Sequence, residues 1–455
     1  MVEPQRLLEL NGAPERSGDY VLYWMQQSQR EAFNPALEVA VAAANRLALP
    51  LLVGFGLMDD FPEANARHYA FMLQGLQETA RSLQARGIGF VARRGAPDLV
   101  ALGLARRAAL VVCDHGYLRI QKQWRAHVAR AAGRRVLRVE GDVVVPVGVA
   151  ASGAQVGART LRPKLAAQCA RFLAPLRRVR PRVSAQSLRI KGDVSLTDIP
   201  RLLARLRLDR SVPPVTDLTG GYRQARRRLE AFAARALRGY VGARAHPAAA
   251  QVSMLSPYLH FGQISPVEIA LAVRAAAAPR ADRDSYLEGL IVRRELAANF
   301  VDNTPDYDRY ECLPAWAQRT LALHARDQRP VVYSYAELAG ARTHDPYWNA
   351  AMREMLATGY MQNHMRMYWG KKVLEWSPSA PQGYARLLRL NNTYFVDGRD
   401  PSSFANVGWV FGLHDRPWPE RPVFGNVRYM NAAGLERKTD IDAYVRRWGA
   451  VARSG

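Results

Sequence analysis

Residues 343–376 read THDPYWNAAMREMLATGYMQNHMRMYWGKKVLEW, a stretch with three tryptophans, three tyrosines and five methionines. Asp345 followed by Pro346 is typical of a helix start, because proline suits the first helical position. The Ser-Pro pair at 377–378 predicts the end of a second helix, since the residue before a proline disfavours helical geometry. Gly359 lies between these signals, so the stretch predicts two helices joined at this glycine.

The three tryptophans of this stretch can be related through helical geometry. Trp369 and Trp376 are seven residues apart and share one helical face, while Trp348 belongs to the preceding helix, which can fold back alongside. Three close indoles between a buried point and the surface could pass an electron in short hops. Large aromatic residues at helical spacing are more often core residues, so the spacing alone leaves electron transfer and core packing both open.

The size and charge of the chain restrict its class. A length of 455 residues favours two to three domains. The 64 lysines and arginines exceed the 40 acidic residues, for a net charge of +24 and a pI of about 10.5. This excess favours a polyanionic partner such as nucleic acid. Only six of the basic residues are lysine. A GC-rich genome would account for this preference for arginine over lysine, but not for the excess of basic over acidic residues.

Other classes have no support in the sequence. No apolar run is long enough to cross a membrane, and the N-terminus does not have the layout of a signal peptide. Cys113, Cys169 and Cys312 are far apart and form no CxxC pair, so the sequence predicts neither a metal site nor a disulfide framework. These features favour a cytoplasmic protein, associated with the nucleoid in a prokaryote.

Residues 17–148 alternate short apolar runs with longer amphipathic segments. The runs expected to be strands are 20–25, 50–58, 88–92, 110–113 and 135–139. The segments expected to be helices are 35–47, 67–86 and 120–132. This alternation predicts an α/β domain with a doubly wound parallel sheet. QQSQR rather than GxGxxG follows the first strand, which argues against a standard dinucleotide site, although such folds bind other ligands at their strand ends.

Residues 149–220 are the predicted connector. Its part from 151 to 190 has nine basic residues and no acidic one, and a helix is expected near 161–176. A charge run is usually a solvated face, and contact with phosphate groups is the more specific alternative.

Residues 221–455 are predicted to be an all-helical domain, and seven of the nine tryptophans lie beyond residue 300. Ser253 and Ser256 lie in a hydroxyl-rich loop that could bind phosphate at a helix N-terminus, although Ser-Pro is also an ordinary helix start. A strong amphipathic helix is expected at 285–300. The Gly, Pro and Asn content of 391–409 predicts a loop.

Motifs spread over nearly the whole chain resemble the class II cyclobutane pyrimidine dimer photolyases of the photolyase/cryptochrome family. They are LYWMQQSQR, RHYAFMLQGLQE, RTLRPK, LSPYLHFGQISP, LIVRREL, THDPYWNAA, MRMYWGKKVLEW, VDGRDP, and HDRPW with RPVFGNVRYMN, in the family's order. The resemblance implies the photolyase fold, with an α/β antenna domain followed by a helical domain that binds FAD. A second antenna chromophore, a deazaflavin or a folate, stays open.

The same resemblance implies an activity. The family's enzymes are carbon–carbon lyases that repair pyrimidine dimers in double-stranded DNA under blue light. Photoexcited, reduced FAD donates an electron to a flipped-out lesion, the cyclobutane ring splits and the electron returns. The expected form of the protein is a monomer.

The resemblance also assigns roles to residues on the FAD side. The expected FAD-binding residues are Tyr240, Ser253, Met254, Leu255, Ser256, Pro257, Arg366, Asp397 and Asn391. Arg366 and Asp397 match an ion pair beside the isoalloxazine ring, where a guanidinium stabilises the anionic reduced ring. Asn391 matches the asparagine near flavin N5, where a neutral amide can both donate and accept a hydrogen bond.

Further matches concern the electron path and the lesion. Trp348, Trp369 and Trp376 match the photoreduction chain, and the resemblance suggests that Trp369 is nearest the flavin and Trp376 outermost. Met367 and Trp409 match residues that pack against the flipped lesion. Each of these residues also has core packing as its ordinary alternative role.

The chain departs from the family pattern on the lesion side. Gly289 stands in LEGL, where the family has LEEL, and so replaces the carboxyl residue expected to bind the dimer. Gln362 and His364 also differ from the pattern and could supply another donor. A photolyase-like FAD photoreceptor or redox flavoprotein without dimer repair therefore stays open beside repair. A nucleic-acid-binding protein that has lost flavin is a third hypothesis, and the retained Arg366, Asp397 and Asn391 argue against it.

Overall fold

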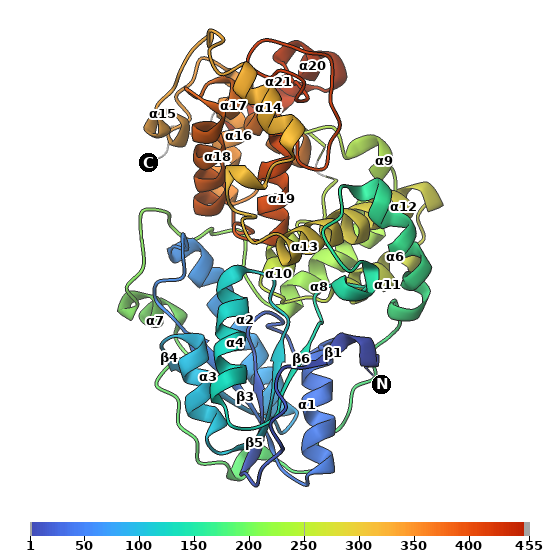
Figure 1. The fold of residues 1–455 in the computed structure, drawn as a ribbon, viewed down its shortest axis with the longest axis vertical. Coiled ribbons are helices and arrows are strands. Elements are labelled where there is room, and N and C mark those ends of the chain that lie inside the picture. Colours follow the sequence, from blue (N-terminus) through green and yellow to red (C-terminus); the bar gives the residue numbers. More distant parts are fainter. Residues whose placement is uncertain (1, 250, 450–455) are drawn as a thin grey trace.

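The computed structural model describes residues 2–249 and 251–449. An α/β half built on one six-stranded sheet is followed by a helical half, as the sequence predicts (Figure 1). The strand order is β1-β6-β5-β2-β3-β4. The strands are β1 Leu7–Glu9, β2 Tyr20–Trp24, β3 Leu51–Leu57, β4 Gly89–Arg94, β5 Ala108–Asp114 and β6 Val136–Val139. All neighbours pair in parallel except β1, which pairs antiparallel with β6.

The sequence explains this sheet. Every residue of β2, β3 and β5 is buried, because helices cover both faces of a parallel sheet. The covering helices are α1 Pro35–Arg46 and α2 Ala66–Ala85 on one face, and α3 Pro97–Ala105 and α4 Arg119–Ala131 on the other. All five predicted strands and all three predicted helices are confirmed to within a few residues. Strand β1, with three residues, and helix α3, which reads as an apolar run, were not predicted.

The connector leads into the helical half, which Figure 1 shows stacked above the sheet. Its helices are α5 Val147–Ala150, α6 Ala158–Phe172, in the region where one was expected, and α7 Ile199–Arg205. The later helices are α8 Tyr222–Ala231, α9 Tyr240–Ala243, α10 Ser256–His260, α11 Pro266–Ala275, α12 Arg280–Leu287, α13 Arg294–Asn303, α14 Ala315–Leu323, α15 Tyr335–Ala339, α16 Pro346–Thr358, α17 Asn363–Glu375, α18 Ala380–Tyr394, α19 Pro401–Val410, α20 Ala432–Lys438 and α21 Ile441–Gly449.

The predicted pair of helices around Gly359 is confirmed as α16 and α17. The Asp345 side chain accepts a hydrogen bond from the Trp348 N–H, and Pro346 takes the first position of α16. Gly359 ends α16 with a φ of 65°, a left-handed conformation that glycine adopts without strain.

Two predictions for the helical half are wrong. Residues 391–409 are not one loop, because α18 continues to Tyr394 and α19 begins at Pro401. The Asp400 side chain accepts a hydrogen bond from the Ser402 N–H, so Asp-Pro acts here as a helix start. Residues 285–300 are not one regular helix either, because the π-helical turn Glu288–Arg293 separates α12 from α13.

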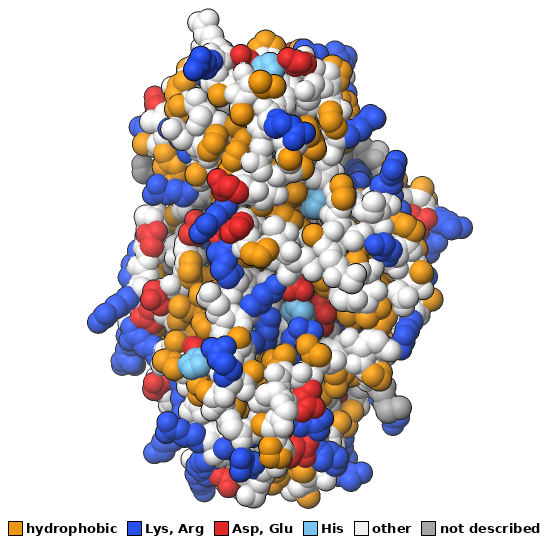
Figure 2. Space-filling model, viewed as in Figure 1, with side chains coloured by type: hydrophobic (Ala, Val, Ile, Leu, Met, Phe, Trp, Pro, Cys, Tyr) orange, Lys and Arg blue, Asp and Glu red, His pale blue; other side chains and the backbone are white. Residues whose placement is uncertain are grey.

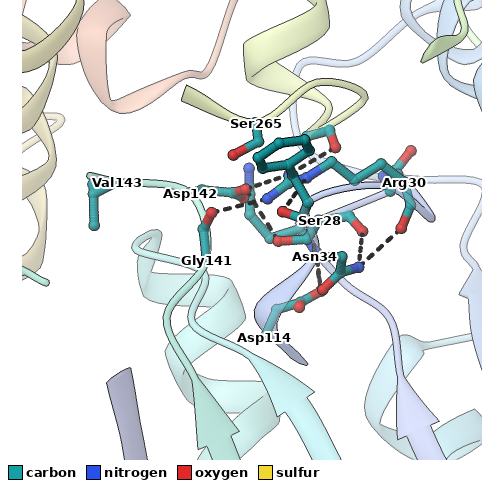
Figure 3. Close-up of polar contacts among 12 residues, drawn as sticks. Ser28, Arg30, Asn34, Asp114, Gly141, Asp142, Val143 and Ser265 are labelled. Atoms are coloured by element: carbon teal, nitrogen blue, oxygen red, sulfur yellow. Dashed lines mark hydrogen bonds and ion pairs between the residues drawn. The ribbon is translucent and has the colours of Figure 1, made fainter. Parts of the chain in front are cut away.

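The QQSQR segment holds the two halves together (Figure 3). Asp114, at the end of β5, accepts hydrogen bonds from the backbone N–H groups of residues 26–28. Arg30 is fully buried, pairs with Asp142 at 2.7 Å and donates to the Gly262 carbonyl of the helical half at 2.9 Å. A Cβ at Gly262 would lie 1.9 Å from the nearest carbonyl oxygen, so only glycine permits this close approach.

The surface carries the excess of positive charge over both halves. Figure 2 shows lysine and arginine side chains spread across the visible face rather than gathered in a single patch. None of the described helices combines the length and the apolar character that a bilayer crossing requires.

Candidate functional site

The three tryptophans of α16 and α17 form one continuous contact series. The Trp348 ring centroid lies 6.1 Å from that of Trp369, with the rings inclined by 17°, and 5.8 Å from that of Trp376. The Trp348 Nε1 donates to the Trp369 carbonyl at 3.0 Å, which holds its ring in place. All three indoles are at most 1% exposed and belong to the core of the helical half. Trp348, from the other helix, therefore lies between the two tryptophans that share a face of α17.

Beyond Trp376 the series reaches partly exposed rings. The Trp376 centroid lies 5.3 Å from those of Tyr333 and His344. The Tyr333 hydroxyl and the His344 Nδ1 are 2.6 Å apart, and His344 is exposed. A charge moving outward from Trp369 through Trp348 therefore ends close to the surface.

At its inner end the series meets Phe395, whose ring centroid lies 6.0 Å from that of Trp369, and through this ring the predicted ion pair. The guanidinium of Arg366, on α17, lies 3.4 Å from the Asp397 carboxylate and 3.8 Å from the Phe395 ring centroid. The buried Arg366 Nε and Trp369 Nε1 have no hydrogen-bond partner among the described residues. These two donors are three residues apart on one face of α17. Since buried polar groups are normally hydrogen-bonded, this pair is what a site completed by a ligand looks like.

Asn391 lies in α18 rather than in a loop, one helical turn before Phe395. Its side chain is 2% exposed, and its Nδ2 donates to the Asn392 Oδ1 at 3.1 Å. The Phe395 N–H donates to the Asn391 carbonyl at 3.2 Å. Asn391 is thus tied to the ring over which the Arg366 guanidinium lies.

The predicted phosphate loop, residues 253–257, is built tightly. The Tyr286 hydroxyl donates to the Ser253 Oγ at 3.0 Å, and Met254 has a φ of 54°, which is unusual for a residue with a side chain. Leu255 is buried, and α10 begins at Ser256 followed by Pro257. Because α10 has only five residues, its helix dipole adds little to the binding of an anion.

Tyr240 and Tyr286 pack beside this loop, with ring centroids 5.5 Å apart. Burial raises the pKa of the Tyr286 hydroxyl well above its ordinary value, so this group stays protonated and donates. Sequence reasoning missed Tyr286. Its position one turn before Gly289, in a predicted amphipathic helix, was the available signal.

The predicted lesion-side residues lie on neighbouring helices, Met367 on α17 and Trp409 on α19. The Arg428 guanidinium lies 5.2 Å from the Trp409 ring and 4.2 Å from the Trp418 ring, and it pairs with Asp415 at 2.9 Å. Arg428 and Trp418 were not predicted individually, although both fall in the motifs HDRPW and RPVFGNVRYMN. Alternating guanidinium and indole groups suit contact with nucleic-acid bases and phosphates.

Gly289 lies in the π-helical turn. A Cβ added there would meet no atom within 4 Å, so the position opens onto empty space. The neighbouring Glu288 carboxylate is 2.7 Å from the Arg162 guanidinium and 3.5 Å from that of Arg293, and so points toward the connector. The helix has a π-helical turn here, but the Glu288 carboxylate is paired with two arginines and does not replace the side chain that Gly289 lacks.

Gln362 does not supply the missing donor in this structure. Its Oε1 accepts from the backbone N–H groups of His364 and Met365, and its Nε2 donates to the Arg244 carbonyl at 2.6 Å. Both ends of the amide therefore serve the start of α17. Glu354 accepts hydrogen bonds from the Gln362 N–H and the Tyr444 hydroxyl, and burial raises the pKa of this carboxyl to about 7.

A separate cavity of about 120 Å³ lies at the carboxyl ends of β2 and β3. Gln26, Gln29, His68, Trp124 and His260 are among its lining residues. Burial and the nearby Arg399 guanidinium hold the pKa of His68 well below its ordinary value, so the ring is neutral. Both amide atoms of Gln26 are buried and have no hydrogen-bond partner in the described part of the chain.

Sequence comparison with known proteins shows which family the chain belongs to. A sequence model of DNA photolyase matches residues 21–182. The deoxyribodipyrimidine photo-lyase of Methanothermobacter thermautotrophicus is 45% identical over 448 residues, which cover 98% of each chain. The chain belongs to the DNA photolyase family. The photo-lyases of the marsupial Potorous tridactylus and of Oryza sativa subsp. japonica are 36% and 37% identical, over 94% of this chain and 80% and 87% of theirs. The predicted resemblance to class II photolyases is thereby confirmed.

Solved photolyases share the fold at lower identity. A class III photolyase from Agrobacterium tumefaciens has a TM-score of 0.75 at 20% identity, covering 96% of this chain and 87% of its own. A photolyase from Sulfolobus tokodaii, with two FAD molecules, has a TM-score of 0.69 at 16% identity, covering 94% and 90%. The predicted photolyase fold is confirmed.

Proposed function

We propose that this chain repairs cyclobutane pyrimidine dimers in DNA by light-driven electron transfer from reduced FAD. The observation that carries the proposal is the tryptophan series ending at Arg366 and Asp397, in a chain 45% identical to a deoxyribodipyrimidine photo-lyase over 98% of its length. A buried series of indoles is not required for DNA binding alone, so it favours a redox protein over a purely structural one.

The residues present fit FAD. The unpartnered Arg366 Nε and Trp369 Nε1 offer donors to a ring system, and Asp397 keeps the guanidinium oriented. Residues 253–257 and Tyr240 are the proposed phosphate side, where Ser253 is fixed by Tyr286. The chemistry that reduced FAD would supply when bound there is an excited-state electron for the lesion. The Arg366 guanidinium stabilises negative charge beside it, since an ion in a partly buried site is poorly screened by water.

The tryptophans serve the return of the flavin to its reduced state. Trp369 is the proposed first donor, Trp348 the second and Trp376 the third, because each neighbouring pair is within about 6 Å between centroids. Burial of all three excludes water, which limits loss of the electron hole to solvent before it reaches the third ring. This series serves both proposed functions, repair and light sensing.

Dimer-containing double-stranded DNA is the proposed partner of the lesion side. Basic side chains of the surface would contact phosphates independently of sequence, and a dimer flips out more readily than a normal base pair because it stacks poorly. Trp409 and Met367 would pack against the flipped lesion, and Arg428 would keep Trp409 in place. The protein would act as a monomer in the cytoplasm.

The cavity beside His68 is the proposed place for a second chromophore, if the protein has one. Its volume of about 120 Å³ is below the roughly 300–1,000 Å³ of ordinary ligand pockets. A deazaflavin or folate would therefore have to displace side chains there.

Three measurements test the proposal. Purified protein should contain FAD, or take it up on incubation, and blue light should then split thymine dimers in duplex DNA. Binding to undamaged DNA should weaken steeply with salt, because phosphate contacts release counterions. Protein that stays colourless after incubation with FAD would refute the redox assignment. A flavoprotein that neither prefers nor splits dimers would instead favour the photoreceptor alternative, for which Gly289 is the supporting observation.

A further inference from the structure

The side-chain amide of Asn391 has a defined orientation, which follows from its neighbour Asn392. The Asn392 Oδ1 accepts from the Arg399 backbone N–H at 3.1 Å, and this N–H can only donate. The Asn392 Nδ2 donates to the Glu63 carboxylate at 2.6 Å, and an ionised carboxylate can only accept. Asn392 is fully buried, so no water competes for these contacts. Its oxygen and nitrogen are therefore assigned by their partners.

This assignment extends to Asn391. The Asn392 Oδ1 lies 3.1 Å from the Asn391 amide, and an acceptor there requires the Asn391 Nδ2 as donor. The Asn391 Oδ1 must then point the other way. Within residues 2–249 and 251–449 no hydrogen bond reaches this oxygen. Asn391 therefore offers a carbonyl, and not an NH₂ group, to whatever lies beside it.

We propose that Asn392 and Glu63 are positioning residues that make Asn391 a hydrogen-bond acceptor toward flavin N5. The inference rests on the proposed function, because it requires FAD beside Asn391. The reduced ring carries a hydrogen at N5 and can donate to the Asn391 Oδ1. The oxidised ring has a lone pair at N5 and meets the same oxygen unfavourably. The arrangement thus favours the reduced flavin that repair requires.

The backbone around Asn392 is rigid enough to hold this orientation. The Arg399 Nη1 donates to the Asn392 carbonyl at 2.7 Å and to the Glu63 carbonyl at 3.3 Å. Arg399 has a φ of 68°, and a Cβ at Gly398 would lie 2.8 Å from the Asn392 carbonyl oxygen, so this turn has a single close-packed form. Glu63 comes from the α/β half, just before α2. That half therefore helps to set the redox properties of a site in the helical half.

The test is the reduction potential of bound FAD in two variants. Asn392→Leu removes the acceptor, and Asn391 can then turn its NH₂ group toward N5. We expect the reduced-to-oxidised ratio to fall about tenfold, which is about 30 mV for a two-electron couple. The double variant Asn392→Asp with Glu63→Gln exchanges the carboxylate and the amide. The carboxylate at position 392 then accepts from the Asn391 Nδ2, and the amide at position 63 donates to this carboxylate. The orientation of Asn391 is kept, so the wild-type potential should return.

Stability measurements provide a readout that needs no flavin. Asn392→Asp alone places two carboxylates together and should lower the Tm of the apoprotein, and adding Glu63→Gln should restore it. Asp60→Ala is the matched control, since Asp60 is an exposed carboxylate three residues from Glu63 and should change neither quantity. Should Asn392→Leu not fold, Asn392→Ala carries the same expectation for the potential without added bulk.

The outcomes separate the two proposals. A normal FAD content with an unchanged potential in the Leu or Ala variant overturns the positioning role and leaves the proposed function intact. A double variant that folds and binds FAD but keeps the lowered potential also overturns it. Wild-type protein that does not bind FAD at all overturns the proposed function, and this inference with it.

Discussion

The two sides of the helical half, the tryptophan side and the lesion side, differ in how strongly packing restricts which residues they can hold. On the tryptophan side, Trp348, Trp369 and Trp376 are at most 1% exposed and are also core residues. On the lesion side, Gly289 is exposed in a π-helical turn, and a Cβ there would touch nothing. Changing an indole of the first side would damage both the core and the electron path. A side chain at Gly289 displaces no neighbour, so this position can vary without damage to the core, which explains how one side keeps the family pattern while the other departs from it.

Loss of the Arg366 charge should give the largest effect. Arg366→Leu leaves the Asp397 carboxylate unpaired at 9% exposure and removes the donor to the ring. We expect FAD to bind about 100-fold more weakly, equivalent to about 2.8 kcal/mol. Equilibrium dialysis against FAD measures this, and Arg389→Leu, outside the flavin side, is the control. Wild-type affinity in Arg366→Leu would show that the Arg366 guanidinium does not contact the flavin.

Interrupting the tryptophan series should have the next largest effect. Trp348→Phe removes the middle indole, and Trp369→Phe the first, while FAD should remain bound in both. We expect photoreduction under blue light with a reductant to slow about tenfold or more in both variants. In Trp348→Phe the electron has to cross from Trp376 to Trp369 without the central indole, and in Trp369→Phe the donor nearest the flavin is missing. Trp448→Phe, on α21, is the matched control. Photoreduction at the wild-type rate in the Trp348 variant would mean that electrons take another route.

Filling the open position on the lesion side should have a smaller effect. Gly289→Glu restores the carboxyl expected from the family pattern, and the structure has room for it. A donor near the lesion carbonyl stabilises the charge that it gains, so the yield of thymine-dimer splitting per absorbed photon should rise about two- to fivefold. Gly103→Glu, a second helical glycine without neighbours within 4 Å, controls for the gain in helix propensity. An equal or lower yield in Gly289→Glu would show that the open position is not a defect of the lesion side.

A pH effect tests the packing of the tryptophan side and should be the smallest. Burial raises the pKa of Glu354, on the same helix as Trp348, from its ordinary 4.5 to about 7. The folded state thus binds this proton more tightly than the unfolded state, and the associated stability, present below pH 4.5, is lost as the pH rises through 7. Glu354→Gln should therefore lose about 2 °C less in Tm between pH 5 and 8 than the wild type.

Glu295 provides the internal reference for that experiment. Burial raises the pKa of this carboxyl to about 8, so it contributes a trend of the same sign in both proteins. Glu354→Gln should flatten the dependence of Tm on pH only in part. Identical curves for the two proteins would show that Glu354 ionises normally in the folded state.

Local patterns were enough to predict most elements of the fold. Alternation of apolar runs with amphipathic segments predicted five strands and three helices of the α/β half, and Asp345, Pro346 and Gly359 predicted the bounds of α16. These signals work because helix caps, left-handed glycines and side-chain periodicity act within a few residues. Composition was a poorer guide at 391–409, where Asp400 and Pro401 start a helix in a stretch that reads as a loop.

The identity of the site residues was also contained in the sequence, through motifs that resemble the photolyase family. What only the tertiary structure decided was their arrangement. It placed Trp348 between Trp369 and Trp376, left the Arg366 Nε without a partner, and oriented Asn391 through Glu63, more than 300 residues away in the chain. Spacing along one helix cannot order rings from two helices, and the direction of an amide depends on partners that folding alone brings together.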